Sequence, residues 1–145
     1  MNLQDLLAEI GLHNDRYTKN FCSKSLSKDI VTESFFFESK GLNLKKNGFG
    51  KNCRLHFFPE ALAKLNSGAA KLILQRMGDK SEVDNINIFI GDFNGKVSVL
   101  VGSEGNVFIG SCGQLSLDIR LGHGGLLLVG DTTTVNHARL VAVNS

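Results

Sequence analysis

Two consecutive stretches of twenty residues decide the fold, VGSEGNVFIGSCGQLSLDIR at 101–120 and LGHGGLLLVGDTTTVNHARL at 121–140. When the second is written beneath the first, Ile109 lies over Val129, and the glycine that follows each of them coincides as well. Self-similarity at a fixed period is the sequence signature of a repeating coil. We therefore expect residues that are twenty apart to stack as neighbouring strands.

Aliphatic residues mark each period of this coil at steps of eight, six and six residues. A six-residue step accommodates a short strand and a corner, with the aliphatic side chain pointing inward, so three steps predict a three-sided coil. Successive turns would stack as parallel strands about 4.8 Å apart. The same shift aligns His137 with Leu117. The anchors are Val101, Ile109, Leu115, Leu121, Val129, Val135 and Val141.

The length and composition fit one domain of the mainly β class. The chain has 145 residues, and ten of its sixteen glycines lie after residue 90, whereas most lysine and arginine residues lie before residue 83. A chain of this length can bury a single core. We divide it into a short, mixed N-terminal segment, residues 1–47, and a β-helix domain, residues 48–145.

Shorter patterns predict the remaining elements. Apolar residues at helical spacing predict an amphipathic helix over residues 3–10 that packs on its own chain, with Asn2 as its cap and Gly11 as its stop. Residues 61–65 are typical of a helical turn. Strands are expected at residues 35–37, 54–58, 72–74, 86–90, 97–101, 107–109, 126–129 and 140–143.

The last of these predicted strands, residues 140–143, begins a new period just before Ser145. An open end of a solenoid exposes unpaired backbone and an apolar cross-section, which natural proteins cover. We therefore expect the chain to be an N-terminal part of a longer protein, or to be covered by a partner.

Charge and cysteine usage argue against several classes. The net charge is only +2 and the basic cluster between residues 45 and 54 is small, so a nucleic-acid partner is not expected. The three cysteines lie far apart, which predicts neither a disulfide framework nor a zinc site and fits the reducing cytoplasm. No apolar run approaches the roughly 20 residues of a membrane span. A soluble, cytoplasmic protein is expected.

Short motifs carry a resemblance to a known family. Residues 129–134, VGDTTT, give an aliphatic residue, a small residue and later hydroxyl residues, and similar openings occur at residues 90, 101, 109 and 121. This pattern resembles the hexapeptide-repeat acyltransferases, whose fold is a left-handed parallel β-helix. The order GKNC at 50–53, a strand, and PEA at 59–61 looks like the opening of the members linked to surface polysaccharide synthesis.

The resemblance implies a function. Enzymes of that family are commonly homotrimers that transfer an acetyl group from acetyl-CoA to a sugar or nucleotide-sugar, at a cleft between neighbouring β-helices. A histidine accepts the proton of the acceptor while backbone amides hold the oxyanion. In the polysaccharide-linked relatives that histidine lies in coils beyond the position of Ser145. Two alternatives stay open: a non-catalytic β-solenoid scaffold or assembly module, and an antiparallel β-sandwich that binds carbohydrate.

The residues themselves offer few catalytic candidates. Should the coil be active, His137 is the fallback general base, because a strand would hold it rigidly; His123 ranks below it, as an exposed turn residue. His123-Gly124-Gly125 is similar to an esterase oxyanion element, yet no G-x-S-x-G accompanies it. The four histidines lack metal-ligand spacing, so no metal site is expected.

Three further side chains have structural interpretations. Cys112 lies in a glycine-rich corner without a neighbouring basic residue, which favours a packed structural thiol over a nucleophile. Asp92 and Asp131 each follow a glycine, a position that is typical of Asx residues bound to the backbone of a turn.

Overall fold

The computed structural model describes residues 1–12, 16, 25–34, 38–44, 48–79, 81, 84–131 and 135–142, without the side chains of residues 136 and 137. In this part the chain is a mainly β protein built as a β-solenoid of about three turns. Its helices are α1 (Leu3–Glu9) and α3 (Pro59–Ser67). The strands are β1 (Val31–Ser34), β2 (Leu42–Leu44), β3 (Arg54–Phe57), β4 (Ala70–Arg76), β5 (Asn87–Ile90), β6 (Asn94–Val101), β7 (Asn106–Ile109), β8 (Gln114–Leu121), β9 (Leu126–Val129) and β10 (Val135–Ala142).

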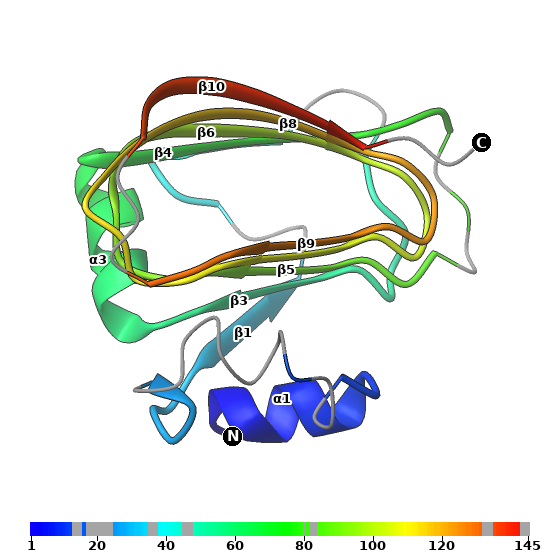
Figure 1. Ribbon diagram of the computed structural model, residues 1–145, viewed down its shortest axis with the longest axis horizontal. Coiled ribbons are helices and arrows are strands. Elements are labelled where there is room, and N and C mark those ends of the chain that lie inside the picture. The colour runs from blue at the N-terminus through cyan, green and yellow to red at the C-terminus, as the bar shows by residue number, and fades with distance from the viewer. Residues whose placement is uncertain are drawn as a thin grey trace.

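The strands form two five-stranded sheets that make the two long sides of a flattened coil (Figure 1). The short-strand sheet has the order β1-β3-β5-β7-β9, and the long-strand sheet has the order β10-β8-β6-β4-β2. Neighbouring strands are parallel except for β1, which pairs antiparallel with β3. Each full turn in the repetitive part therefore holds one short and one long strand.

The spacing of the anchors predicted a coil with three sides, but the structure has two sheets. The reason is that one of the six-residue steps contains no corner. Leu115 and Leu121 both belong to β8, whose inward side chains alternate without a break from one to the other. Neither glycine nor proline, the strongest breakers of regular structure, lies between these two leucines, so the strand runs on through this step. The other two steps cross glycine-rich corners, so each turn of the coil has two.

The predicted stacking register is confirmed for the middle of the solenoid and shifts at its last strand. Val101 pairs with Leu121 across β6 and β8, and Ile109 pairs with Val129 across β7 and β9. Strand β10 contains an irregularity between Val135 and Ala138, after which residues pair at a separation of twenty-one. The predicted alignments of His137 with Leu117 and of Val141 with Leu121 are therefore wrong, because a β-bulge adds one residue to β10.

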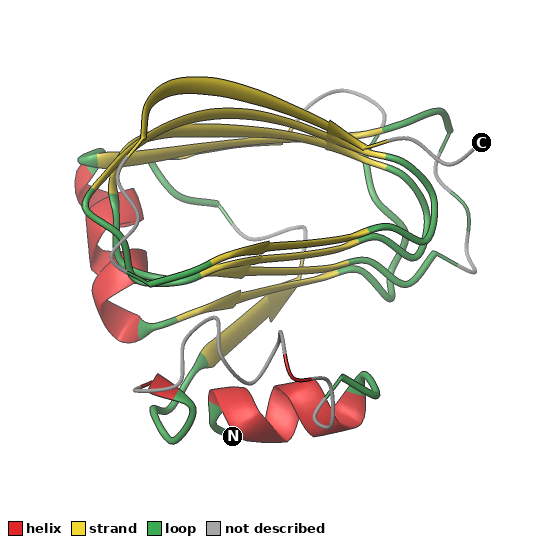
Figure 2. Cartoon of the chain, viewed as in Figure 1, coloured by secondary structure: helices red, strands yellow, loops and turns green. Residues whose placement is uncertain are grey.

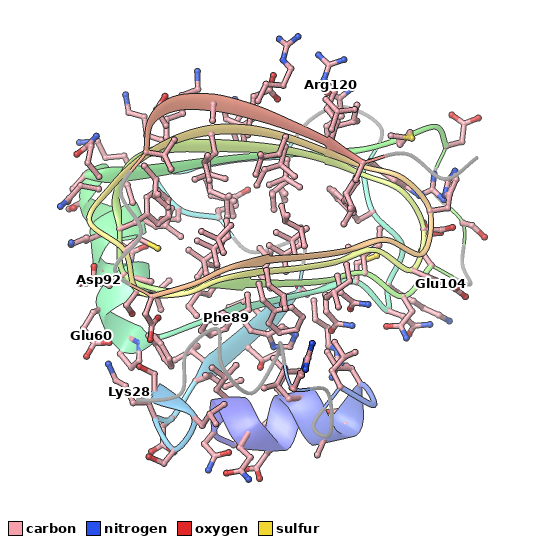
Figure 3. All side chains as sticks on the ribbon, viewed as in Figure 1. Lys28, Glu60, Phe89, Asp92, Glu104 and Arg120 are labelled. Atoms are coloured by element: carbon pink, nitrogen blue, oxygen red, sulfur yellow. The ribbon has the colours of Figure 1, made fainter. Side chains whose placement is uncertain are left out.

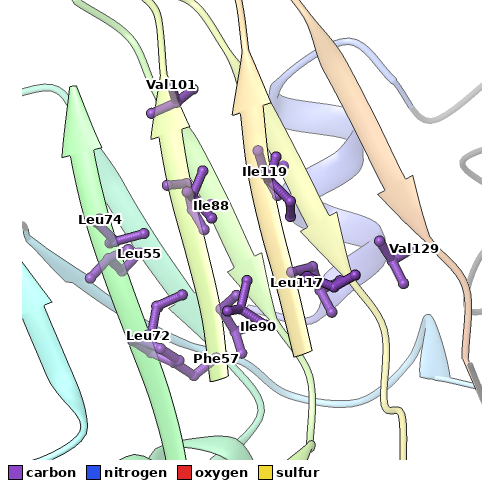
Figure 4. Close-up of a cluster of buried hydrophobic side chains, with 14 of the residues drawn as sticks. Leu55, Phe57, Leu72, Leu74, Ile88, Ile90, Val101, Leu117, Ile119 and Val129 are labelled. Atoms are coloured by element: carbon purple, nitrogen blue, oxygen red, sulfur yellow. The ribbon is translucent and has the colours of Figure 1, made fainter. Parts of the chain in front are cut away.

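Aliphatic side chains from both sheets meet inside the coil and form one core (Figure 4). Leu55 and Phe57 of β3, Ile88 and Ile90 of β5, and Leu72 of β4 are fully buried there. Burial of each such side chain contributes about 1.5–3 kcal/mol. Because each turn presents the same inward positions, the stacked turns share one continuous core.

The predicted N-terminal helix is confirmed as α1, and it covers the outer face of the short-strand sheet (Figures 1 and 2). Asn2 and Asp5 form a reciprocal capping box at its start, at 2.8 and 3.0 Å. Its buried leucines, such as Leu6, pack against three phenylalanines in the sheet or directly after β3. Those are Phe58, Phe89 and Phe108, with Phe89 edge-on to Phe58 and stacked with Phe108.

Residues before position 48 contribute to both sheets. In the long-strand sheet Leu42 of β2 pairs with Leu72 of β4, and in the short-strand sheet Val31 of β1 pairs with Phe57 of β3. The helical turn predicted at 61–65 lies within α3, which begins with Pro59 and closes one rounded end of the coil (Figure 2). The strand predicted at 35–37 falls outside the described residues.

No described helix combines the length and the apolar character needed to cross a membrane.

Candidate functional site

A polar hollow of about 500 Å3 lies where the C-terminal end of α1 meets the first residues of three short strands. The strands β3, β5 and β7 start side by side because they are parallel and in register. The hollow is open to solvent on the outer face of the coil. Its polar and backbone lining comes mainly from Glu9, Arg54, Asn87, Glu104, Asn106 and Gly124.

Strand register explains why polar side chains gather there. Arg54 pairs with Asn87, and Asn87 pairs with Asn106, so the three first residues form one row across the sheet. Side chains alternate along a strand. Since the next residues, Leu55 and Ile88 among them, point into the core, this row faces outward beside α1.

The floor of the hollow rests on a buried histidine. His56 is fully buried, and its ring nitrogens lie 2.9 Å from Thr32 Oγ1 and 3.1 Å from Asn87 Oδ1. Because an amide oxygen only accepts, His56 Nε2 carries the proton and Nδ1 accepts from the Thr32 hydroxyl. Burial lowers the pKa of His56, against the opposing effect of the bond to Asn87. The ring is thus neutral and holds the Asn87 side chain in one orientation.

The other polar contacts in the row are long. Asn87 Nδ2 donates to the side-chain oxygens of Asn85 and Asn106 at 3.4 Å each, and Asn106 Nδ2 donates to the Glu104 carbonyl at 3.5 Å. Typical N–H···O bonds are about 2.9–3.0 Å long. A ligand hydroxyl that offers shorter bonds can therefore compete for these amides.

One ion pair borders the hollow. Arg54 Nη1 donates to Glu9 Oε1 at 3.0 Å, with both side chains partly exposed to solvent. The pair joins the end of α1 to the start of β3. Because it is solvated, it contributes little to stability. Its guanidinium retains further N–H donors toward the hollow.

Glu104 adopts a left-handed backbone conformation that side chains disfavour. Its φ is +59°, and Gly124, at the same place in the next turn of the coil, has φ +70°. Both residues line the hollow. Residues other than glycine adopt this region at a cost of about 1–2 kcal/mol. The chain therefore carries a carboxylate where the neighbouring turn uses glycine.

His123 lies in the turn between β8 and β9, with its side chain exposed as predicted. Its Nδ1 accepts from the backbone N–H of Ser103 at 2.9 Å and lies 3.0 Å from the Ser103 hydroxyl. A nitrogen that accepts from an amide carries no proton, so the neutral ring is protonated at Nε2. The nitrogen left for a substrate is therefore a donor, and the ring links two stacked turns.

His137, the predicted fallback base, lies in β10 between Val135 and Ala138, at the shift of register; its side chain falls outside the described residues, as does His13. The structure therefore places His123 in a turn and His137 on the long-strand sheet. No group of three or more His, Cys, Asp or Glu side chains that could hold a metal ion occurs among the described residues.

The two aspartates also make contacts beyond their own turns. Asp131 Oδ1 accepts from the backbone N–H of Ser111 at 2.7 Å, which joins successive turns of the coil. Asp92 instead forms an ion pair with Lys64 of α3 at 2.7 Å. Cys112 is half-buried, and its Sγ lies 3.2 Å from the Gly110 carbonyl, which agrees with a packed structural thiol.

A second buried polar contact lies away from the hollow. Arg76 and Asp84 form a bidentate ion pair, and Asp84 also accepts from the Ser81 N–H at 2.9 Å. The bonds from Arg76 hold the pKa of Asp84 below its usual range. Nearby, burial raises the pKa of the Cys53 thiol, which keeps it protonated. This cluster joins Arg76 at the end of β4 to Asp84 and Ser81.

Sequence reasoning missed the polar hollow. The one signal was a polar residue inside an apolar run, His56 between Leu55 and Phe57, because its partners Thr32 and Asn87 are distant in sequence. Comparisons with protein-family models, with curated proteins and with solved structures return no match for the chain.

Proposed function

We propose that this protein is an acyltransferase-type protein that transfers an acetyl group from acetyl-CoA to a sugar intermediate of surface polysaccharide synthesis. The observation that supports the proposal is the solenoid itself. Turns of about twenty residues stack in register, and glycine follows the aliphatic residue that ends β5, β7 and β9, as at Ile109-Gly110 and Val129-Gly130. A parallel β-solenoid is the general architecture that the resemblance to hexapeptide-repeat acyltransferases implies, although this coil has two sheets in place of three sides.

The proposed reaction balances without a redox partner. A sugar hydroxyl oxygen attacks the thioester carbonyl, the new C–O bond forms, the C–S bond breaks, and CoA leaves as the thiol. The proton of the hydroxyl passes to a general base, and the oxyanion requires N–H donors. The protein must therefore supply one basic nitrogen that is free to accept a proton.

Of the two histidine candidates, His137 suits the role of base better than His123. The Nδ1 atom of His123 is already occupied by Ser103, and its Nε2 is the protonated nitrogen of the neutral ring. A base must present its unprotonated nitrogen to the acceptor. In the proposed homotrimer, His137 on β10 would serve a cleft shared with a neighbouring copy.

A cytoplasmic location is part of the proposal, because Cys53 and Cys112 are both free thiols.

Release of CoA tests the reaction directly. The full chain, incubated with acetyl-CoA and a panel of hexoses and amino sugars, should generate thiol and acetylated sugar in equal amounts. The His137→Gln variant should lose this activity, and His123→Gln should keep it. Thiol release that is unchanged in His137→Gln, or absent with every acceptor, would refute the assignment.

Apolar side chains exposed on the edge strands β9 and β10 favour a second candidate, a non-catalytic assembly module. Leu126 of β9 and Leu140 and Val141 of β10 are 40%, 37% and 57% exposed. Exposed apolar side chains on terminal strands are typical of surfaces that bind a partner. Sedimentation tests whether the chain self-associates. The proposed trimer predicts three times the chain mass, and a clean monomer at all concentrations would contradict the trimer.

A further inference from the structure

We infer that the polar hollow beside α1 binds a neutral polyhydroxylated ligand, a mono- or disaccharide. The inference goes beyond acetyl transfer and does not depend on it, since neither His123 nor His137 belongs to the lining. A hollow of about 500 Å3 lies within the range of small-molecule sites, about 300–1,000 Å3.

The floor is preorganised by buried groups. Asn87 lines the hollow although it is only 2% exposed, and His56 behind it is fully buried. The 3.1 Å bond between them fixes the amide of Asn87 before any ligand arrives. Binding groups that are held in place by a second layer lose little entropy on binding.

Hydrogen-bond chemistry favours hydroxyl groups as the ligand. The amides of Asn87 and Asn106 offer N–H donors and, at Asn106, an acceptor oxygen, and the bonds that their NH2 groups donate within the protein are only 3.4–3.5 Å long. A hydroxyl both donates and accepts, so neighbouring hydroxyls of a sugar can satisfy an amide row and a carboxylate together. Glu104 supplies that carboxylate at the end of the coil opposite α3 (Figure 3).

The balance of charge argues against an anionic ligand. Arg54 is already paired with Glu9, and Glu104 adds a second carboxylate, so the lining carries more negative than positive charge. A phosphate or carboxylate ligand would be repelled. Among the described lining residues no aromatic ring occurs on which a nucleobase could stack. A neutral, polar ligand remains.

Backbone strain supplies an independent argument. Glu104 keeps a side chain at φ +59°, in a position where the next turn of the coil has Gly124. Strained residues cluster at binding and active sites, where their side chains are needed. Within the described part of the chain only the backbone carbonyl of Glu104 is engaged, and its carboxylate is left available to a ligand.

Nuclear magnetic resonance of the full, isotope-labelled chain tests the inference. The probes are methyl α-glucopyranoside, N-acetylglucosamine and maltose, with inorganic phosphate as the anionic comparison. At least one saccharide should shift the amide signals of residues 85, 87, 104, 106 and 124 saturably, and phosphate should not. No saturable shift with any of the three saccharides, or phosphate binding in their place, would overturn the inference.

Matched variants separate binding from folding. Glu104→Gly should weaken the saccharide about tenfold while raising the melting temperature, because glycine relieves the strain. Asn106→Ala should weaken binding by a similar factor. The control, Asn94→Ala, changes an exposed asparagine at the start of β6 and should leave the affinity within about twofold. Unchanged binding by Glu104→Gly, or an equal loss in Asn94→Ala, would place the ligand elsewhere.

Discussion

His56 Nε2 donates to Asn87 Oδ1 at 3.1 Å across strands β3 and β5, and both side chains are almost completely buried. This contact joins two neighbouring strands on the outer face of the short-strand sheet. The His56 ring is also hydrogen-bonded to Thr32 of β1, and it holds the Asn87 amide that forms the floor of the polar hollow. Its chemistry makes the stability of the fold depend on pH.

The free energy of unfolding should fall as the pH decreases below about 6.5. Burial lowers the pKa of His56 in the folded protein, so the unfolded chain binds its proton first. The folded state therefore loses stability between the unfolded and the folded pKa, by at most about 1.4 kcal/mol per pH unit. Arg54 reinforces the lowering and Glu9 opposes it. Urea unfolding between pH 8 and pH 5 measures the slope.

Two variants isolate this pH effect. His56→Gln removes the titrating ring and should flatten the dependence between pH 6.5 and 5, whereas His123→Gln, an exposed histidine, should retain it. The same slope in His56→Gln as in the unmodified chain would assign the pH dependence to other groups.

Truncation of Asn87, the hydrogen-bond partner of His56, should lower the free energy of unfolding. Asn87→Ala leaves the buried Nε2–H of His56 without an acceptor, which costs about 1–3 kcal/mol of unfolding free energy. The exposed Asn94→Ala should cost less than about 0.5 kcal/mol. Chemical denaturation measures both, and equal effects of the two substitutions would contradict the buried bond.

Substitution of Glu104, the residue with left-handed backbone angles, should raise the free energy of unfolding. Glu104→Gly should stabilise the protein by about 1 kcal/mol, since glycine adopts φ +59° without steric strain. At the equivalent place in the next turn, Gly124→Ala should destabilise by a similar amount, because alanine meets that strain at φ +70°. Thermal unfolding checks the pair. Destabilisation by Glu104→Gly would show that the Glu104 side chain contributes more than the strain costs.

Breaking the buried ion pair should be more harmful than replacing it. Arg76→Ala strands the Asp84 carboxylate in the interior and should cost about 3–5 kcal/mol. The double variant Arg76→Met with Asp84→Leu should recover much of that loss, because no charge is then buried. If the double variant were as unstable as Arg76→Ala, the pair would stabilise the segment through its hydrogen bonds to backbone groups as well.

The repeat in the sequence predicted the stacking but not every detail of the coil. Ile109 and Val129 pair as expected because inward aliphatic positions must recur in each turn for the core to be continuous. Anchor spacing alone could not distinguish a corner from a straight strand, so Leu115 and Leu121 were assigned to different sides although they share β8. The bulge in β10 has no counterpart in the repeat, which displaced the predicted position of His137 by one residue.

The polar hollow could not be predicted from the sequence for a different reason. Its row of Arg54, Asn87 and Asn106 is created by pairing between strands separated by unequal connections, and the repeat of twenty residues does not extend back to β3. The strain at Glu104 is likewise a property of the folded turn. Local patterns reveal periodic positions, whereas contacts between unrelated positions require the register.

Thermal unfolding in the presence of acetyl-CoA tests the proposed acyltransferase function most directly. A ligand that binds the native state stabilises it, by about 2.7 kcal/mol at a hundredfold excess over its dissociation constant. The full chain should show a saturable rise in melting temperature with acetyl-CoA and none with adenosine diphosphate at equal concentration. An unchanged melting temperature at millimolar acetyl-CoA would contradict the proposal and leave the solenoid as a binding or assembly module.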